Sequence, residues 1–110
     1  MKHLKQYETI NEGLPTVGDF VICAENISSD NEVRAKEFTQ NNIGQLVKIE
    51  DNDRHYRYRV KYENVPYDIS YQFMIYDGDY IRPMTLPELT YWSKDKNELL
   101  PYITVNKYNL

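Results

Sequence analysis

The residues that could carry nucleophilic or metal chemistry are few. The 110-residue chain has one cysteine, Cys23, and two histidines, His3 and His55. A Cys23–His55 dyad has little support, because Cys23 stands in the apolar run 20–24 and apolar surroundings raise the pKa of a thiol. No HxxxH or CxxC spacing supplies a zinc site. We therefore predict a protein that is not an enzyme, that has no cofactor or metal, and that buries Cys23 as a small core residue.

Acidic and glycine motifs add no ligand chemistry. Asp51 and Asp53 resemble the start of an EF-hand loop, but the glycine and the closing glutamate that such a loop needs do not follow. The four glycines are scattered and form neither a P-loop nor a GxGxxG motif. Segment 51–54 is therefore interpreted as a turn.

Basic side chains alternate with apolar ones along segment 55–63. His55, Arg57, Arg59 and Lys61 alternate with Tyr56, Tyr58, Val60 and Tyr62. A period of two puts these two sets on opposite faces of a strand. The basic face is either a solvated surface, balanced by cross-strand acids such as Glu50, or a docking strip for an acidic peptide or a phosphate backbone. The second interpretation makes Arg57, Arg59 and Lys61 candidate binding residues.

Tyrosine is unusually frequent, with 11 of the 110 residues. Tyrosine favours half-buried sheet surfaces, and it also serves interfaces because it offers contact area at a low entropic cost. A domain of this size cannot bury every tyrosine between residues 67 and 80. We select Tyr67 and Tyr71, in the loop marked by Pro66 and Asp68, and Tyr80 across the sheet as candidate partner-binding residues.

The elements that would position these residues are mostly strands. Short apolar runs predict strands at 17–24, 43–50, 55–63 and 71–76, with an antiparallel hairpin formed by 43–50 and 55–63. Asp77-Gly78 lies between apolar runs and predicts a second hairpin. The long excursion 26–42 has room for a short helix over 32–38.

A helix is predicted at the C-terminal side of these strands. Thr85 and Glu88 have the spacing of a capping box, and Pro87 is tolerated in a first turn. Apolar residues at helical spacing, with Trp92 among them, then predict a helix over 86–99. Pro101 is expected to end this helix, and 101–110 to form a tail in which 102–105 could add an edge strand.

Three segments resemble small SH3-like β-barrels of the KOW, Agenet and Mind bomb type. They are Val17-Gly18-Asp19, the run GQLVKI at 44–49, and the run YRVKYEN at 58–64. The resemblance covers 17–64 and implies a non-catalytic module that reads peptides, modified tails or nucleic acid from loops at one edge of the barrel. The long excursion, the acidic balance and the added helix depart from this family, so the resemblance is carried over for the fold and not for a ligand. The composition, rich in Asn and Tyr, also resembles that of small phage and viral proteins.

These observations combine into one prediction. We expect a mainly β (α+β) domain, an SH3-like barrel of about five antiparallel strands at 17–110 with a C-terminal capping helix, preceded by an arm at 1–16. No apolar run reaches 18 residues and no leader pattern opens the sequence, so we expect a cytoplasmic protein. The net charge of −4 argues against general nucleic-acid affinity. The expected function is protein binding. If the protein is viral, we expect it to inhibit a host enzyme or a defence factor. The alternative is a nucleic-acid-associated barrel that binds through the basic strand face.

Overall fold

The computed structural model describes residues 13–23, 33–51 and 57–108. The predictions for His3, His55, Tyr56 and most of the 51–54 turn lie outside these residues. The elements follow one another as β1 (Phe20–Ile22), α2 (Val33–Gln40), β2 (Gly44–Ile49), β3 (Tyr58–Tyr62), η2 (Tyr67–Gln72), β4 (Met74–Tyr76), β5 (Asp79–Met84), η3 (Leu86–Glu88), β6 (Tyr91–Ser93) and α3 (Lys96–Tyr108). No helix in the described part of the chain is both long and apolar enough to cross a bilayer.

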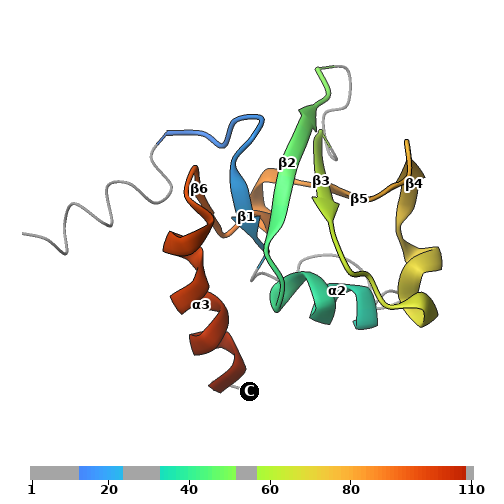
Figure 1. Cartoon of the computed structure of the whole chain (residues 1–110). Helices are drawn as coiled ribbons and strands as arrows, with labels where there is room; N and C mark the ends of the chain where they lie inside the picture. Colours follow the sequence, from blue (N-terminus) through green and yellow to red (C-terminus); the bar gives the residue numbers. More distant parts are fainter. Residues whose placement is uncertain (1–12, 24–32, 52–56, 109–110) are drawn as a thin grey trace, which may run out of the picture.

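The strands form one open antiparallel sheet, as Figure 1 shows. Their order across the sheet is β4-β5-β3-β2-β1-β6, so β4 and β6 are the outermost strands. Helix α3 lies at the β1–β6 end of the sheet, and η2 lies at the β4 end (Figure 1). The prediction of a β-rich α+β domain with a C-terminal helix is therefore confirmed, with six strands in place of about five.

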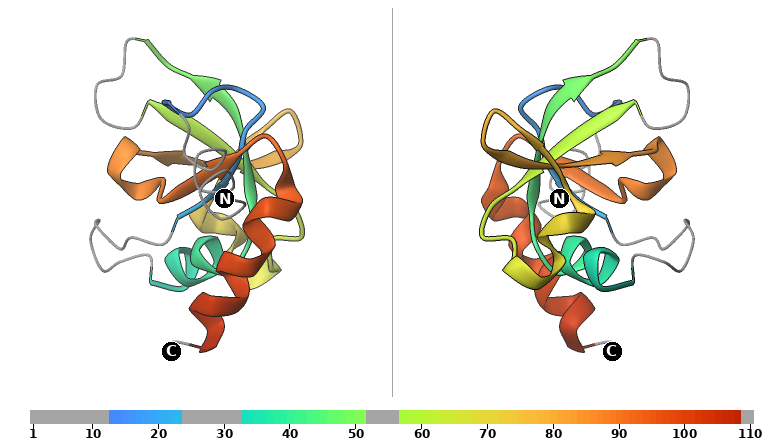
Figure 2. Two further views of the ribbon diagram at one scale, coloured as in Figure 1. Left: turned by 90° about the vertical axis from the view of Figure 1, so that its left-hand side faces the viewer. Right: turned by 90° about the vertical axis from the view of Figure 1, so that its right-hand side faces the viewer.

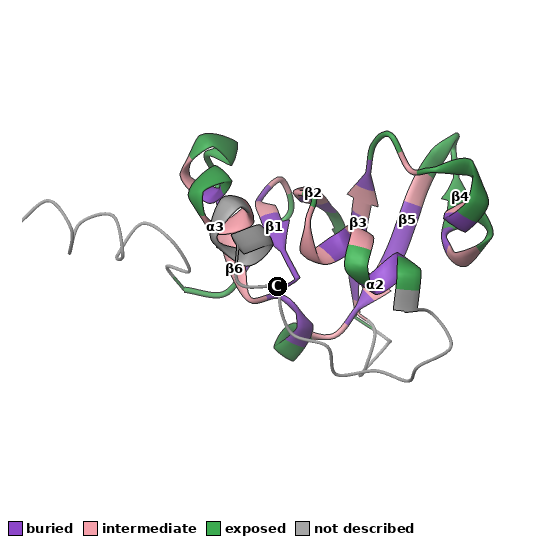
Figure 3. Cartoon of the chain, turned by 90° about the horizontal axis from the view of Figure 1, so that it is seen from below, coloured by how far each residue is buried: buried purple, intermediate pink, exposed green. Residues whose placement is uncertain are grey.

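Strand β3 confirms the alternation expected from the sequence. Tyr58, Val60 and Tyr62 are buried, whereas Arg59 and Lys61 are half-buried on the opposite face. The buried face of the sheet carries the main core, to which α2 and η2 also contribute; Figure 3 shows this burial on the central strands. The main core consists of Val21, Cys23, Ala35, Leu46, Tyr58, Val60, Tyr62, Ile69, Phe73, Met84 and Leu89. We call the face that carries Arg59 and Lys61 the outer face.

Both predicted hairpins are present. Strand β2 pairs with β3, with Leu46 opposite Val60 and a bulge between Leu46 and Lys48. Strand β4 pairs with β5 through a two-residue turn, in which Asp77 has φ 52° and Gly78 has φ 83°. Two consecutive positive φ values define a type I′ turn, whose twist matches that of the strands it joins.

The single helix predicted over 86–99 is wrong for its first part, and only its residues 96–99 belong to α3. Thr85 and Glu88 do form the capping interaction, since the Thr85 N–H donates to the Glu88 carboxylate at 2.9 Å, but it closes only the 3₁₀ turn η3. Residues 91–93 then form strand β6 and pair with β1, with Trp92 opposite Val21. The exposed edge of β1 supplies backbone partners to this segment, and this tertiary pairing outweighs the local helical spacing. Trp92 therefore packs on the core from a strand.

The C-terminal helix begins later than expected and continues through Pro101. Asp95 caps it, because its side-chain oxygen accepts the Asn97 N–H at 2.9 Å. The helix runs to Tyr108, so the tail and the edge strand predicted after Pro101 are wrong as well. Pro101 has no backbone N–H, so the helix lacks one hydrogen bond at this position.

Helix α3 covers one end of the outer face. It packs on β1 and β6, and Figure 2 shows it from two sides. Ile22 and Leu99 are fully buried but lie outside the main core. The rings of Tyr91 and Tyr102 lie 4.3 Å apart between their centroids. A second, smaller apolar layer thus fixes α3 to the sheet.

The first and fourth predicted strands are at most half as long as expected, and one predicted helix is confirmed. Residues 17–19 form a turn before β1, since Gly18 has φ 99°, a value that favours glycine. Residues 67–72 form η2, so the fourth predicted strand begins only at Met74. The short helix expected within the excursion is α2.

Candidate docking face

The outer face carries a row of residues that crosses five strands. Directly paired residues lie on the same face of an antiparallel sheet. The register pairs Phe20 with Gln45, Gln45 with Lys61, Lys61 with Ile81, and Ile81 with Met74. Helix α3 packs on the β1–β6 end of this face. One hollow lies between α3 and the sheet, and another lies over β2, β3, β5 and β4.

The first hollow lies over β2, β3, β5 and β4. Its volume is about 190 Å³, and we call it the apolar hollow. Met74 and Tyr76 on β4 are 49% and 66% exposed, and Ile81 forms its floor. Charged groups stand at its border, where the Lys48 ammonium lies 3.2 Å from the Glu50 carboxylate. Its lining consists of Val47, Lys48, Glu50, Arg59, Met74, Tyr76 and Ile81.

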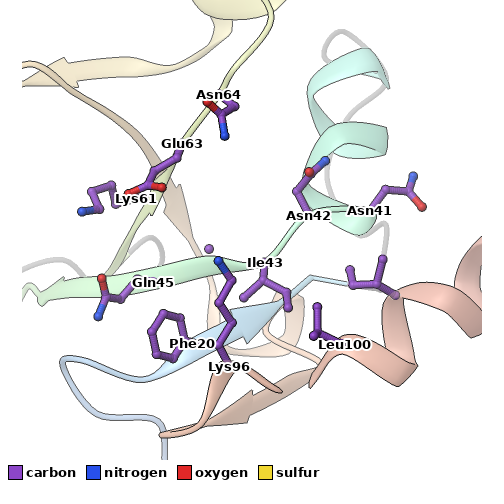
Figure 4. A pocket seen from close by; sticks show the side chains of 12 residues that line it. Phe20, Asn41, Asn42, Ile43, Gln45, Lys61, Glu63, Asn64, Lys96 and Leu100 are labelled. Carbon is purple, nitrogen blue, oxygen red and sulfur yellow. The ribbon is translucent and has the colours of Figure 1, made fainter. Parts of the chain in front are cut away.

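The second hollow lies between α3 and the sheet and is shown in Figure 4. Its volume is about 270 Å³, and we call it the α3 pocket. Apolar side chains from β1, from Ile43 just before β2 and from α3 form part of its walls, while amide side chains and three charged groups supply the rest. Its lining consists of Phe20, Asn41, Asn42, Ile43, Gly44, Gln45, Lys61, Glu63, Asn64, Lys96, Leu100 and Ile103.

The end of α2 places two of these amides. The Asn41 and Asn42 side-chain amides donate to the Glu37 and Phe38 carbonyls, each at 2.8 Å. Carbonyls in the last turn of a helix lack helical partners, so these bonds close α2. The Asn41-Asn42 pair, which follows α2, thus forms one wall of the α3 pocket.

The basic residues predicted as a strip are spread along the outer face. Arg59 lines the apolar hollow and Lys61 lines the α3 pocket. Arg57 lies just before β3 and lines neither of these hollows: its guanidinium stands 5.6 Å from the centroid of the Tyr58 ring and 3.7 Å from the Asp51 carboxylate. Two of the three candidate cations therefore border hollows.

The three candidate tyrosines do not come together. Tyr67 and Tyr71 lie on η2 with 93% and 78% of their surface exposed, and neither lines the apolar hollow or the α3 pocket. The side chains of Arg34 and Asp68 form an ion pair that joins α2 to η2. Tyr80 is half-buried against the main core, with its ring 6.3 Å from that of Phe73, because it faces inward opposite Tyr62. Tyr80 thus lies away from the outer face.

The sequence interpretation missed the apolar members of the docking face. Val47, Met74 and Ile81 come from three different strands, and only the order of the strands brings them together. Lys96 lies at the start of α3 and lines the α3 pocket. The alternation within β5 was a usable signal, since it separates Ile81 from the inward-facing Tyr80.

The Cys23 thiol and the Arg82 guanidinium are buried and contact other groups of the protein. The Cys23 sulfur lies 3.5 Å from the Tyr62 hydroxyl and 3.8 Å from the Met84 sulfur. Burial raises the pKa of the Cys23 thiol to about 12, and it also raises the pKa of Tyr62 well above its ordinary value. Arg82 is buried as well and donates to the Gln72 carbonyl at 2.8 Å. A protonated, enclosed thiol is a poor nucleophile.

Metal ligands do not gather in the described residues. No group of three or more His, Cys, Asp or Glu side chains in 13–23, 33–51 and 57–108 could hold a metal ion.

Comparison with known proteins finds no relative: no protein-family model, no curated protein and no solved structure matches the chain.

Proposed function

We propose that this chain is a non-catalytic protein-binding module that docks an acidic, partly apolar segment of a partner protein on its outer face. The observation that carries this proposal is the apolar hollow. Exposed apolar side chains that gather in one concave surface and have a polar border are typical of a protein-interaction site. Met74, Tyr76 and Ile81 supply the apolar part, and Lys48 and Arg59 supply the border.

The charge of the face gives the partner its sign. The whole chain has a net charge of −4, whereas the charged groups around the centre of the outer face sum to +1, with Lys48, Arg59 and Lys61 against Glu50 and Glu63. A locally positive surface on an acidic protein favours encounter with acidic segments and disfavours basic ones. An acidic segment that also carries apolar side chains matches both properties of the hollow.

The SH3-like character of the domain belongs to the same proposal. Its support is the three sequence segments within 17–64 and the consecutive antiparallel pairing of β1, β2 and β3. An inhibitor of a host enzyme, encoded by a virus, would be one special case of such a module. The non-catalytic assignment has its support in the enclosed Cys23 thiol.

A peptide selection tests the proposal. The full chain is immobilised and a phage-displayed library of random 12-residue peptides is selected on it; we expect enrichment of peptides that combine Asp or Glu with Leu, Ile or Phe. The variants Arg59→Glu and Met74→Asp should each weaken binding of the enriched peptides tenfold or more, equivalent to about 1.4 kcal/mol. Circular dichroism should show both variants folded, because Arg59 stands at the border of the hollow and Met74 is half exposed.

Two matched variants and one alternative ligand make this test decisive. Tyr67→Ala and Tyr71→Ala remove exposed tyrosines outside the hollow and should change peptide affinity less than twofold. If these two variants abolish binding while Arg59→Glu does not, the docking surface is η2 and the proposal is wrong. Submicromolar, salt-sensitive binding of duplex DNA or RNA, together with no enriched peptide, would establish the nucleic-acid alternative instead.

A further inference from the structure

The α3 pocket has the features of a site for a small charged group. Its walls combine apolar side chains, such as Phe20 and Leu100, with amide side chains, such as Gln45. Figure 4 shows the Lys96 side chain reaching from α3 toward β2 and β3. Polar groups that converge within a partly apolar concavity are typical of ligand sites in proteins.

The pocket carries a net positive charge. Lys61 and Lys96 contribute two positive charges, and Glu63, which Figure 4 shows beside Lys61, contributes one negative charge. Neither lysine forms an ion pair with another residue of the described part of the chain. The remaining charge of +1 matches one carboxylate. A phosphate carries about two negative charges at neutral pH and would meet stronger repulsion from Glu63.

The α3 pocket and the apolar hollow adjoin each other. Lys61 lines the pocket, Ile81 lines the hollow, and these two residues are direct neighbours on β3 and β5. Gln45 and Ile81 lie two strands apart, which is about 10 Å at roughly 4.8 Å per strand. An extended chain of about four residues spans that distance at about 3.3 Å per residue. One short peptide can therefore reach both hollows.

We infer that the α3 pocket binds the carboxylate of a Glu or Asp side chain of the partner, while an apolar side chain about three to five residues away in the same segment fills the apolar hollow. This inference rests on the proposed function and makes it more specific. The Lys61 and Lys96 ammonium groups neutralise the carboxylate, and the Gln45 amide can donate to it. The spacing between the acidic and the apolar residue becomes the recognition signal of the segment.

Small carboxylates test the pocket separately from the peptide. The full chain, labelled with ¹⁵N, is titrated with N-acetylglutamate α-amide, and backbone amide shifts are followed by NMR. We expect saturable shifts around Gln45 and Lys61, with a Kd in the millimolar range, equivalent to about −4 kcal/mol. Lys96→Gln should abolish these shifts. Arg34→Gln removes an exposed cation outside both hollows and should leave them unchanged.

Three further titrations decide the chemistry of the ligand. N-acetyllysine α-amide should cause no saturable shift at these residues, and inorganic phosphate and N-acetylalanine should bind more weakly than N-acetylglutamate α-amide. Tighter binding of phosphate would overturn the carboxylate assignment. Tighter binding of N-acetylalanine would show that the pocket binds a C-terminal carboxylate and not a side-chain carboxylate. Glu63→Gln should strengthen phosphate binding, since it removes the repelling charge.

The two proposals fail in distinguishable ways. Peptides that bind the apolar hollow without any saturable shift from N-acetylglutamate α-amide would overturn the inference and keep the proposed function. Saturable shifts in the pocket with no enriched peptide would overturn the proposed function. In peptides that bind, moving the acidic residue next to the apolar residue should weaken affinity at least tenfold in the wild-type chain and much less in Lys96→Gln; equal effects in both proteins would contradict the inference.

Discussion

The Cys23 sulfur lies 3.5 Å from the Tyr62 hydroxyl in the centre of the main core. Cys23 follows β1, Tyr62 is the last residue of β3, and both side chains are almost completely buried. Both groups are neutral in the folded protein at pH 7, because burial raises the pKa of each. This contact makes the only cysteine of the chain a probe of folding.

The first prediction concerns the reactivity of the Cys23 thiol. Its pKa rises from an ordinary 9.0 to about 12, so well below pH 9 the folded protein holds about 10³ times less thiolate than the unfolded chain. Ellman's reagent at pH 8 should therefore modify the native protein at least 100 times more slowly than the protein in 6 M guanidinium chloride. Equal rates in the two solutions would show that the thiol is accessible in the native state.

The second prediction concerns stability at alkaline pH. A raised folded pKa means that the unfolded chain ionises first, so the stabilising contribution of the Cys23 thiol is complete below pH 9 and is lost between pH 9 and about pH 12. At pH 10 the loss should be about 1.4 kcal/mol relative to pH 8. Urea denaturation at these two pH values measures it. Cys23→Ala should lose much less over the same interval, because Tyr62 has an ordinary pKa of 10.0 and contributes mainly at higher pH.

The third prediction concerns the turn between β4 and β5. A Cβ at Gly78 would have no atom within 4 Å, so the cost of Gly78→Ala arises from the positive φ of 83° alone. We expect a loss of about 1 kcal/mol in the free energy of unfolding. Asp77→Asn is the matched control, since Asn also tolerates the left-handed conformation, and it should cost less than about 0.5 kcal/mol. Equal losses in the two variants would contradict the type I′ assignment.

This turn and strand β3 are the parts of the fold that local sequence predicts best. Alternation within 58–62 and the Asp77-Gly78 pair are properties of neighbouring residues, and each determines its own local geometry. The helix prediction for 86–99 was wrong because the structure of this segment depends on a distant part of the chain. Whether 91–93 forms a helix turn or a strand depends on the free edge of β1, about 70 residues earlier in the chain. A local pattern contains no information about that partner.

On the outer face, too, only the features that depend on neighbouring residues could be predicted from the sequence. Arg59 and Lys61 were predictable, because they lie on one strand with a clear period of two. The apolar hollow was not, because Val47 lies on β2, Met74 on β4 and Ile81 on β5, and the strand order sets their proximity. Exposure of Tyr67 followed from the turn residues around it, but its distance from the hollow did not.

The last prediction concerns the contact of Gly44 with β3 in the core. A Cβ at Gly44 would lie 2.5 Å from Val60 Cγ1 and 2.8 Å from two atoms of the Tyr62 ring. Since the core is closely packed, Gly44→Ala should cost about 1–3 kcal/mol in the free energy of unfolding, measured by urea denaturation. Val60→Ala removes the nearest of these atoms, so the double variant Gly44→Ala/Val60→Ala should be more stable than the sum of the single losses predicts, by about 1 kcal/mol or more. Additive losses would show that steric contact with Val60 is not the cause, and a loss below about 0.5 kcal/mol in Gly44→Ala would contradict the packing of β2 on β3.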